Sequence, residues 1–317
     1  MKKCICILFS LCLLFPLVAF GTAEPSSESG KDDTAGKPTV AVSFNAIREI
    51  VSAVGGDKIT VVPVVPETAE PHHYEPRPKD LQVLKTASLL FVNGLEMETW
   101  AEELVEKKVL AENTVIDLSR GIDLLAIEEH GEAHSHETCH TCHEGHHHGE
   151  YDPHIWLGLT EAGKMAQNAA AALKTIDPEN AAYYDANAEK FAAALVSLRD
   201  EYREKIASKQ QKTIIVGHEA FAYLCRDLGL EQKGIRDVFN EGEPSAKMLK
   251  ELVRYCKEND IRMIFSEEQA SPQVSNALAR DAHTSVAVIY TLEIAADGLS
   301  LYERQKANLE KIYASLR

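Results

Sequence analysis

Short apolar runs alternate with amphipathic stretches through the first part of the chain. The runs are rich in Val, Ile and Leu and predict strands, whereas the stretches between them have helical spacing. The predicted strands are Thr39–Ser43, Ile59–Val65, Ser88–Val92 and Thr114–Asp117. The predicted helices are Ala46–Val54, Pro78–Thr86 and Glu96–Val109. This order predicts a parallel α/β lobe, in which the Val-rich Ile59–Val65 strand is buried on both faces.

The same alternation returns after residue 210. The predicted strands are Thr213–Val216, Met263–Phe265 and Ser285–Ile289. The predicted helices are Ala220–Leu228, Glu243–Asn259, Gln273–Ala282 and Leu301–Leu316. The fold class that we predict is therefore α/β, with two parallel-sheet lobes and a cleft between them.

A long helix is predicted between the lobes. An Ala-rich helix is predicted over Thr160–Ile176. Asp177 and Pro178 then suit the start of a second helix, because Asp is a good N-cap and Pro fits the first helical position. No helix-breaking residue follows over Glu179–Lys209. Its apolar stripe consists of Tyr184, Ala188, Phe191, Leu195, Leu198, Tyr202 and Ile206. At about 1.5 Å per residue, this helix is about 45 Å long and could join two lobes as a strut. An ordinary long surface helix is the alternative.

The N-terminus has the pattern of a secretory signal. Lys2 and Lys3 precede the apolar stretch 5–20, and small residues then allow cleavage near Ala23. A membrane anchor is the alternative, but about 16 apolar residues are fewer than the roughly 20 needed to span a bilayer. We predict a soluble, exported periplasmic protein. Its segments are a signal peptide (1–23), a disordered tether (24–37), an N-terminal α/β lobe (38–177) with a His-rich loop (128–150), a linking helix (178–209) and a C-terminal α/β lobe (210–317).

The charge balance argues against binding to nucleic acid. Lys and Arg number 33 against 49 for Asp and Glu, which gives a net charge of −16. No basic block could follow a phosphate backbone.

Three histidines lie in loops marked by Pro or Gly. His72 and His218 follow predicted strands, at the edge where parallel sheets bind ligands, and His154 directly precedes a helix. One loop histidine alone is usually just exposed to solvent. Three in similar contexts, beside a His-rich tract, predict a metal site, since neutral imidazole is a good zinc ligand.

Other polar residues near these loops have simpler explanations. His73 should face away from His72, because successive extended residues point in opposite directions. His283 ends a predicted helix, where a partial negative charge favours it. Asp152 could accept a hydrogen bond from the His154 ring or cap the following turn.

A His-rich tract over 130–148 has no apolar periodicity and cannot form a packed core. We expect it to bind metal weakly as an accessory loop. Its Cys139 and Cys142 could add soft ligands or form a local disulfide. Its histidines are His130, His134, His136, His140, His143, His146, His147 and His148.

Two more cysteines, Cys225 and Cys256, lie in predicted helices of the second lobe. In an exported protein they could form a disulfide that closes a loop of about 30 residues. Buried free thiols are the alternative.

Several segments together resemble one protein family. The first two are 71–81 (PHHYEPRPKDL) and 92–100 (VNGLEMETW), and the next two are 152–156 (DPHIW) and 218–224 (HEAFAYL). Segments 243–246 (EPSA) and 265–269 (FSEEQ) are also similar. They resemble the cluster A-I solute-binding proteins of zinc and manganese ABC importers, which include the periplasmic ZnuA-type zinc-uptake proteins.

The resemblance implies two α/β lobes joined by a rigid helix, with the metal between them on His72, His154 and His218. Manganese relatives commonly have Glu as third ligand and Asp as fourth. This chain has His218 at the third place and Glu293 at the fourth, so the fourth position could hold Glu293, water or nothing.

The function that follows is capture of Zn²⁺, the transported ligand, by a monomer that delivers it to the transmembrane subunit of an ABC permease. A manganese or other divalent-metal protein of the same importer class is one alternative. A zinc hydrolase is another, although no His-Glu-x-x-His helix or nucleophile elbow is present. A metal buffer that acts only through the His-rich tract is a third. We do not expect an enzyme.

Overall fold

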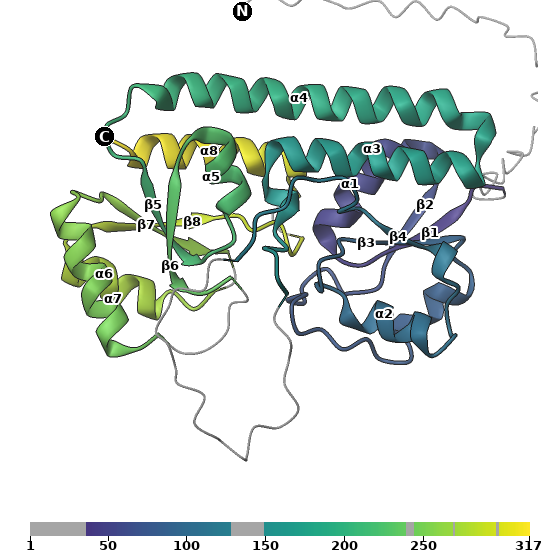
Figure 1. The fold of residues 1–317 in the computed structure, drawn as a ribbon, viewed down its shortest axis with the longest axis horizontal. Helices are drawn as coiled ribbons and strands as arrows, with labels where there is room; N and C mark the ends of the chain where they lie inside the picture. The colour runs from purple at the N-terminus through teal and green to yellow at the C-terminus, as the bar shows by residue number, and fades with distance from the viewer. Residues whose placement is uncertain (1–35, 128–148, 239–243, 269, 296–297) are drawn as a thin grey trace, which may run out of the picture. The chain divides into compact units, whose positions relative to one another are not determined.

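The strands form two separate four-stranded parallel sheets, each covered by helices (Figure 1). The computed structural model describes residues 36–127, 149–238, 244–268, 270–295 and 298–317. The predicted signal peptide, nearly all of the predicted tether and the histidines of the His-rich tract lie outside these residues. Residues 37–317 belong to one compact unit.

The first sheet has the strand order β2-β1-β3-β4. Its strands are β1 (Thr39–Val42), β2 (Thr60–Pro63), β3 (Leu89–Val92) and β4 (Val115–Asp117). The helices of this lobe are α1 (Asn45–Gly55) and α2 (Thr99–Glu106), with a 3₁₀ segment over Asp80–Lys85. Because β1 and β3 are central, their residues are almost all buried, and their carboxyl ends lead into the loops beside the site.

The β2 strand does not have the predicted environment. It pairs with β1 at the edge of the sheet, and all four of its residues are half-buried. The prediction of burial on both faces was therefore wrong. A Val-rich run indicates a strand, but it does not distinguish a central strand from an edge strand whose outer side lacks a neighbour.

The second sheet has the order β6-β5-β7-β8. Its strands are β5 (Thr213–His218), β6 (Glu231–Arg236), β7 (Met263–Glu267) and β8 (Ser285–Ile289). The helices are α5 (Ala222–Leu228), α6 (Ala246–Glu258), α7 (Gln273–Ala282) and α8 (Leu301–Ser315). Sequence patterns missed β6, because it is a polar edge strand in which only Ile235 is buried.

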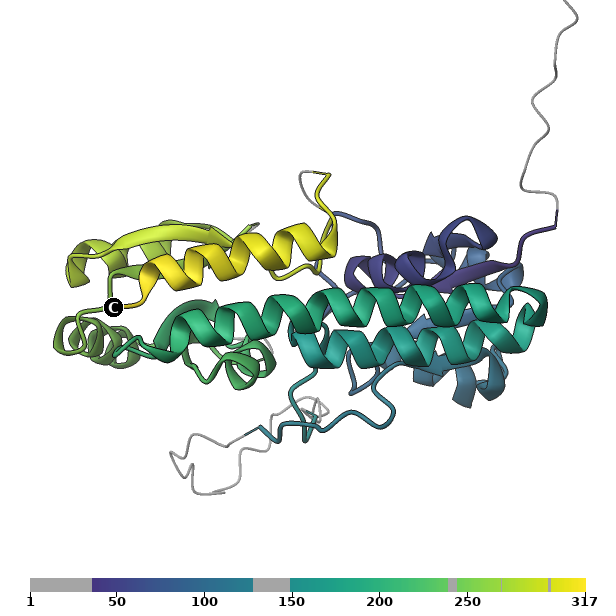
Figure 2. The same ribbon diagram turned by 90° about the horizontal axis from the view of Figure 1, so that it is seen from above.

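A long helix runs along both lobes, as predicted (Figures 1 and 2). After a 3₁₀ turn over Pro178–Asn180, α4 (Ala181–Ala207) continues for 27 residues, which corresponds to about 40 Å. It packs against α1 and α3 (Leu159–Ile176) at one end and against α5 and α8 at the other. Its buried residues are Tyr184, Ala188, Leu195, Leu198, Tyr202 and Ile206. The helix therefore shares one apolar core with both lobes.

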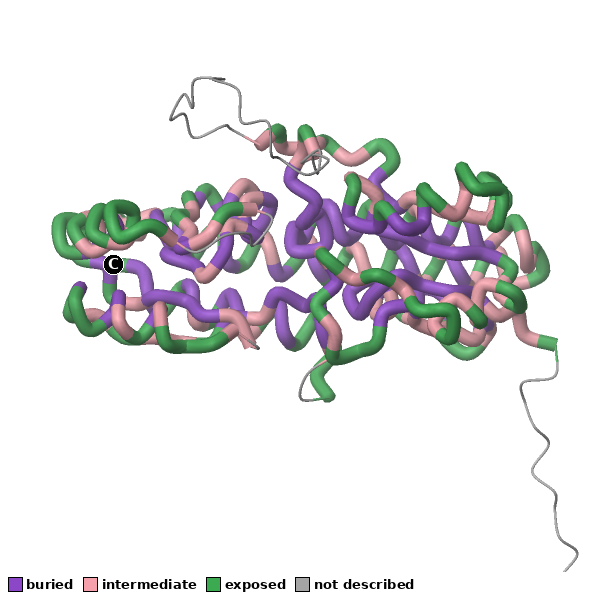
Figure 3. The backbone as a smooth tube through the Cα atoms, turned by 90° about the horizontal axis from the view of Figure 1, so that it is seen from below, coloured by how far each residue is buried: buried purple, intermediate pink, exposed green. Residues whose placement is uncertain are grey.

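Buried residues follow the central strands and the segments between the two sheets (Figure 3). The largest apolar cluster includes residues of α1, α3, α4, α5 and α8, together with one face of each sheet. Two smaller clusters lie under α2 and under α6 and α7. Among the described residues, no helix is long and apolar enough to cross a membrane.

The predicted disulfide between Cys225 and Cys256 is not formed. Both residues are buried free cysteines. Cys225 belongs to the large cluster, whereas Cys256 on α6 belongs to the cluster under α6 and α7. The two helices are close in sequence, but they bury their cysteines in different parts of the core, so the free-thiol alternative holds.

Candidate metal centre

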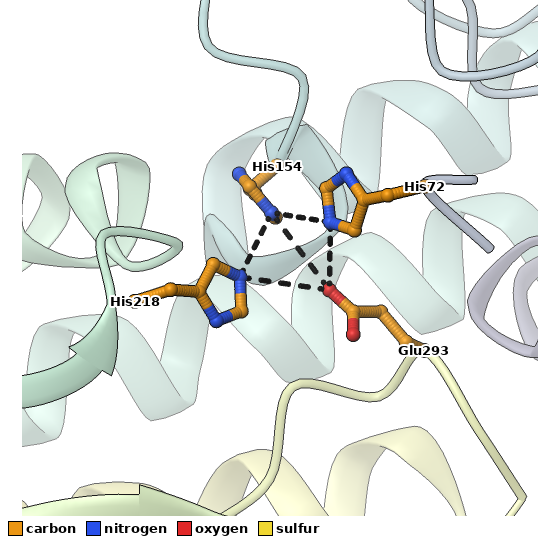
Figure 4. A group of neighbouring side chains, drawn as sticks. All are labelled: His72, His154, His218 and Glu293. Atoms are coloured by element: carbon orange, nitrogen blue, oxygen red, sulfur yellow. Dashed lines mark hydrogen bonds and ion pairs between the residues drawn. The ribbon is translucent and has the colours of Figure 1, made fainter. Parts of the chain in front are cut away.

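Four side chains from distant parts of the sequence converge on one point between the lobes (Figure 4). They are His72, His154, His218 and Glu293, and one possible ligand atom from each lies within 4.8 Å of all the others. Their loops come from both halves of the chain. The structure thus brings together all three histidines predicted from loop context and the carboxylate implied by the family resemblance.

His218 is the last residue of β5, and Glu267 is the last residue of its parallel neighbour β7. Carboxyl ends of adjacent parallel strands meet at one sheet edge, so the two side chains lie side by side. Glu267 Oε1 lies 2.7 Å from His218 Nδ1 and 2.9 Å from its backbone nitrogen. When Nδ1–H donates to this carboxylate, Nε2 is left free to face the cluster.

Asp152 holds His154 in the same way. Its Oδ1 accepts from the backbone N–H of His154 at 2.9 Å and lies 2.8 Å from the ring Nδ1. One oxygen therefore serves both of the roles that were considered for Asp152, shaping the turn and orienting the ring. The imidazole directs Nε2 into the cluster.

His72 and Glu293 complete the group. The backbone N–H of His72 donates to Glu70 Oε1 at 3.0 Å, within the loop that follows β2. Glu293 Oε2 accepts from Thr291 Oγ1 at 3.1 Å. The second carboxylate oxygen, Oε1, faces the three imidazoles.

Five of the six distances between the facing atoms are close to those of a tetrahedral shell. His154 Nε2 lies 3.2 Å from His72 Nε2 and 3.3 Å from His218 Nε2. Glu293 Oε1 lies 3.3 Å from His72 Nε2 and 3.8 Å from the Nε2 atoms of the other two. A tetrahedral zinc ion with ligands at about 2.0–2.1 Å requires ligand–ligand distances of about 3.3 Å. The His72 and His218 Nε2 atoms lie within 4.8 Å of each other, so these two imidazoles would move closer together to complete a zinc shell.

The site is almost fully enclosed, and burial changes its protonation. His154 and His218 are 0 % exposed and Glu293 is 7 % exposed. Burial, together with the neighbouring His72 and His218, lowers the pKa of His154 well below its usual range. Burial also disfavours protonation of His218, but the hydrogen bond and charge of Glu267 outweigh it and raise its pKa to about 9. The two imidazoles therefore differ in charge near neutral pH without a metal.

The carboxyl groups also respond to this environment. Burial raises the pKa of Asp152 to about 7. Burial likewise acts to raise the pKa of Glu293, but the hydrogen bond with His72 and the charges of His72 and His218 hold it below its usual value. Glu293 therefore stays an anion, which suits a ligand for a divalent cation.

A cavity of about 190 Å³ adjoins the cluster. Its charged lining residues are Glu70, Arg236, Glu267, Glu268 and Glu293. Four carboxyl groups against one guanidinium favour the approach of a cation over that of an anion.

The other candidate histidines lie apart from the cluster. His73 is exposed and is not part of it, as its position next to His72 predicted. His283 follows the last residue of α7 with a left-handed φ of 59° and is also exposed. The histidines of the His-rich tract, 130–148, lie outside the described residues.

Sequence patterns missed the role of Glu267 beside His218. A signal was present, because Glu267 closely follows the predicted strand Met263–Phe265, and this strand ends beside its parallel neighbour β5. Asn45 and Trp156, which bind the Glu293 segment from the N-terminal lobe, carried no such signal, since they lie 247 and 135 positions away from their partners in the sequence.

Two parallel α/β lobes, one long shared helix and an enclosed His₃Glu group define a metal-binding protein of the two-lobed substrate-binding class. The model of the family described as "Zinc-uptake complex component A periplasmic" (ZnuA) matches residues 40–315. The chain belongs to this family of metal-binding substrate-binding proteins of ABC importers, which are transport proteins and not enzymes.

Relatives that are named for different metals align with most of this chain. A Treponema pallidum protein named for metal binding is 37% identical over 99% of this chain and 96% of its own length. The Bacillus subtilis "High-affinity zinc uptake system protein ZnuA" is 32% identical over 94% and 91%. A Streptococcus gordonii "Manganese ABC transporter substrate-binding lipoprotein" is 29% identical over 100% and 99%. The names of these relatives therefore specify zinc in one case and manganese in another.

A solved structure supports the same fold. The zinc-bound crystal structure of a ZnuA deletion mutant superposes with a TM-score of 0.73 at 31% identity. It covers 88% of this chain and 98% of its own. The prediction of two α/β lobes joined by a long helix is confirmed.

Proposed function

We propose that this protein captures Zn²⁺ outside the cytoplasm and delivers it to the transmembrane subunit of an ABC permease. His72, His154, His218 and Glu293 are the proposed ligands. The observation that carries the proposal is the spacing of their facing atoms, mostly 3.2–3.8 Å, around one point.

The donor set favours zinc over manganese. Three imidazole nitrogens and one carboxylate oxygen suit a borderline-soft ion, whereas Mn²⁺ prefers oxygen ligands and binds most sites more weakly. The order of affinities also places copper above zinc, so supply and geometry must exclude copper.

The site is built for holding an ion and not for reacting with it. A catalytic zinc usually keeps a position open for water, but here Glu293 fills the fourth position and the group is enclosed by protein. This arrangement, together with the family, argues against the hydrolase alternative.

The remaining features support an exported protein. We propose that residues 1–23 act as a signal peptide cleaved near Ala23 and that residues 24–37 form a tether. We also propose that the His-rich tract collects metal weakly, beside the tight site. One chain supplies all four ligands, so the site works in a monomer.

A metal competition tests the proposal. The mature protein, stripped of metal, is equilibrated with equal concentrations of Zn²⁺ and Mn²⁺, and the metal that survives a wash with a weak chelator is counted. We expect one zinc per chain in the wild type and in His283→Ala, and much less in His154→Ala. Retention of manganese, or zinc retention unchanged in His154→Ala, would refute the proposal.

A further inference from the structure

The segment that carries Glu293 is fastened mainly by residues of the N-terminal lobe, although it belongs to the C-terminal half of the chain. The Trp156 indole donates to Thr291 O at 2.8 Å, and the backbone N–H of Ala295 donates to Glu67 O at 2.8 Å. Trp156 lies two residues after His154, and Glu67 lies in the loop that leads to His72. Both ends of the segment are thus tied to the loops of N-terminal ligands.

Asn45, the first residue of α1, makes the closest connection to Glu293. Its amide nitrogen donates to Leu292 O at 3.0 Å and to Ile294 O at 2.9 Å, the carbonyls directly before and after Glu293. Asn45 is 2 % exposed and lies 247 and 249 positions away from these carbonyls in the sequence. A side-chain amide has two N–H donors, so one group can hold both carbonyls.

The oxygen of this side-chain amide, Oδ1, fixes the orientation of the group. Arg48 donates to Asn45 Oδ1 at 2.7 Å, so the oxygen faces the guanidinium and the nitrogen faces the segment. Arg304, which is 1 % exposed, donates to Ile294 O at 2.9 Å and also pairs with Glu49 on α1. Buried donors from α1 and α8 therefore converge on the same carbonyl.

The backbone of the segment needs such support. Leu292 is fully buried and has a left-handed φ of 65°, which is unfavourable for any residue with a side chain. Unfavourable backbone conformations persist where the surroundings determine them, and they gather at functional sites. The hydrogen bonds from Asn45 hold the backbone in this conformation directly beside Glu293.

We propose that Asn45 is a positioning residue that fixes Glu293 as the fourth metal ligand before the metal arrives. Asn45 on α1 thus connects Glu293 to the lobe that carries His72 and His154. His218 is positioned separately, by β5 and β7. The inference rests on the proposed zinc function and deepens it.

A double-mutant cycle tests this role. Zinc dissociation constants are measured by chelator competition for the wild type, Asn45→Ala, Glu293→Gln and the double variant. We expect Asn45→Ala to weaken zinc binding about 10- to 100-fold in the wild-type background, as loss of an orienting partner does. In the Glu293→Gln background the same change should have less than about a threefold effect, because residues that act through one another are not additive.

Asn168 offers a matched control. Its side-chain amide also bridges two backbone carbonyls, Leu118 O and Arg120 O, each at 2.9 Å, away from the metal cluster. Asn168→Ala should leave zinc affinity unchanged. Equal losses in both backgrounds, or a loss of affinity in Asn168→Ala as large as in Asn45→Ala, would overturn the positioning role.

Cobalt supplies an independent readout. The visible spectrum of Co²⁺ reports coordination geometry, so Asn45→Ala and Glu293→Gln should change the wild-type spectrum in the same way. If Asn45→Ala does not fold, Asn45→Asp, which keeps the acceptor for Arg48 but lacks both N–H donors, enters the same cycle. Tight zinc binding by the wild type with an additive cycle rejects this inference alone, whereas a wild type without tight binding rejects the proposed function.

Discussion

At the scale of single residues, the cluster depends on the Nδ1 atoms of His154 and His218, which face away from it. Asp152 and Glu267 each hold an Nδ1 atom at 2.8 and 2.7 Å, which turns Nε2 of His154 and His218 toward a common point. Such outer partners set the tautomer and the direction of a ligand. A histidine of this chain therefore contributes to the cluster only where a neighbouring carboxylate or loop directs its ring toward it.

His218→Ala should weaken zinc binding far more than His73→Ala or His283→Ala. Loss of an outer partner typically costs 10- to 100-fold in affinity, so loss of the ligand itself should cost more than about 100-fold. The exposed His73 and His283 should change affinity by less than about threefold. A competition titration with a zinc chelator measures all three, and equal damage from His73→Ala would contradict the ligand assignment.

Zinc binding should release a proton near pH 8. The pKa of His218 is raised to about 9, so its imidazole is protonated below that pH in the metal-free protein, and zinc must displace the proton. Apparent affinity should therefore rise about tenfold per pH unit toward pH 9 and level off above it. Calorimetry at pH 8 in buffers of different ionisation enthalpy should find release of about one proton.

Glu267→Gln tests whether the released proton comes from His218. It removes the charge that raises the pKa of His218, so its proton release at pH 8 should fall well below that of the wild type. Equal release by both proteins would show that the proton comes from another group.

At the scale of elements, sequence patterns predicted most helices and strands, because apolar spacing reflects which face is buried. They failed at one edge strand of each sheet. β6 is mostly polar and was missed, and β2 was placed in the interior. The three histidines of the cluster could be predicted because each lies in a loop marked by Pro or Gly, and two of these loops follow strands. Asn45 could not, because its contacts join α1 to a loop 247 positions away.

The described residues on the two sides of the His-rich tract are paired with each other in the N-terminal lobe. Ala126 and Tyr151 form an antiparallel bridge, and Ile127 N–H donates to Glu150 O at 3.1 Å. Replacing residues 131–148 with a short Gly/Ser linker should therefore leave this lobe folded. We expect weak zinc equivalents to disappear and one tight site to remain in an equilibrium titration. A folded variant without tight binding would favour the buffer hypothesis.

At the scale of the whole molecule, α1, α4 and α8 join the two lobes around the site. α4 shares the large apolar cluster with both lobes, and α8 contributes the buried Arg304 to an ion pair with Glu49 on α1. Glu49 also accepts from the backbone N–H of Leu301. Packing, the buried pair of Glu49 and Arg304 and the hydrogen bonds of Asn45 therefore all connect the two lobes.

Glu49→Ala should destabilise the fold strongly. Removing one partner of a buried pair leaves the Arg304 charge without compensation and costs about 3–5 kcal/mol of unfolding free energy. Glu310→Ala, which breaks an exposed pair with Lys306 on the same helix, should cost less than about 1 kcal/mol. Urea denaturation of the metal-free proteins compares them, and similar losses would show that the buried pair is not a special link.

Anomalous diffraction from zinc-loaded crystals shows directly whether zinc binds among His72, His154, His218 and Glu293. Data collected on either side of the zinc absorption edge should give one strong peak about 2.0–2.2 Å from the three Nε2 atoms and Glu293 Oε1, which vanishes below the edge. A zinc peak elsewhere in the lobes with this site empty would contradict the account.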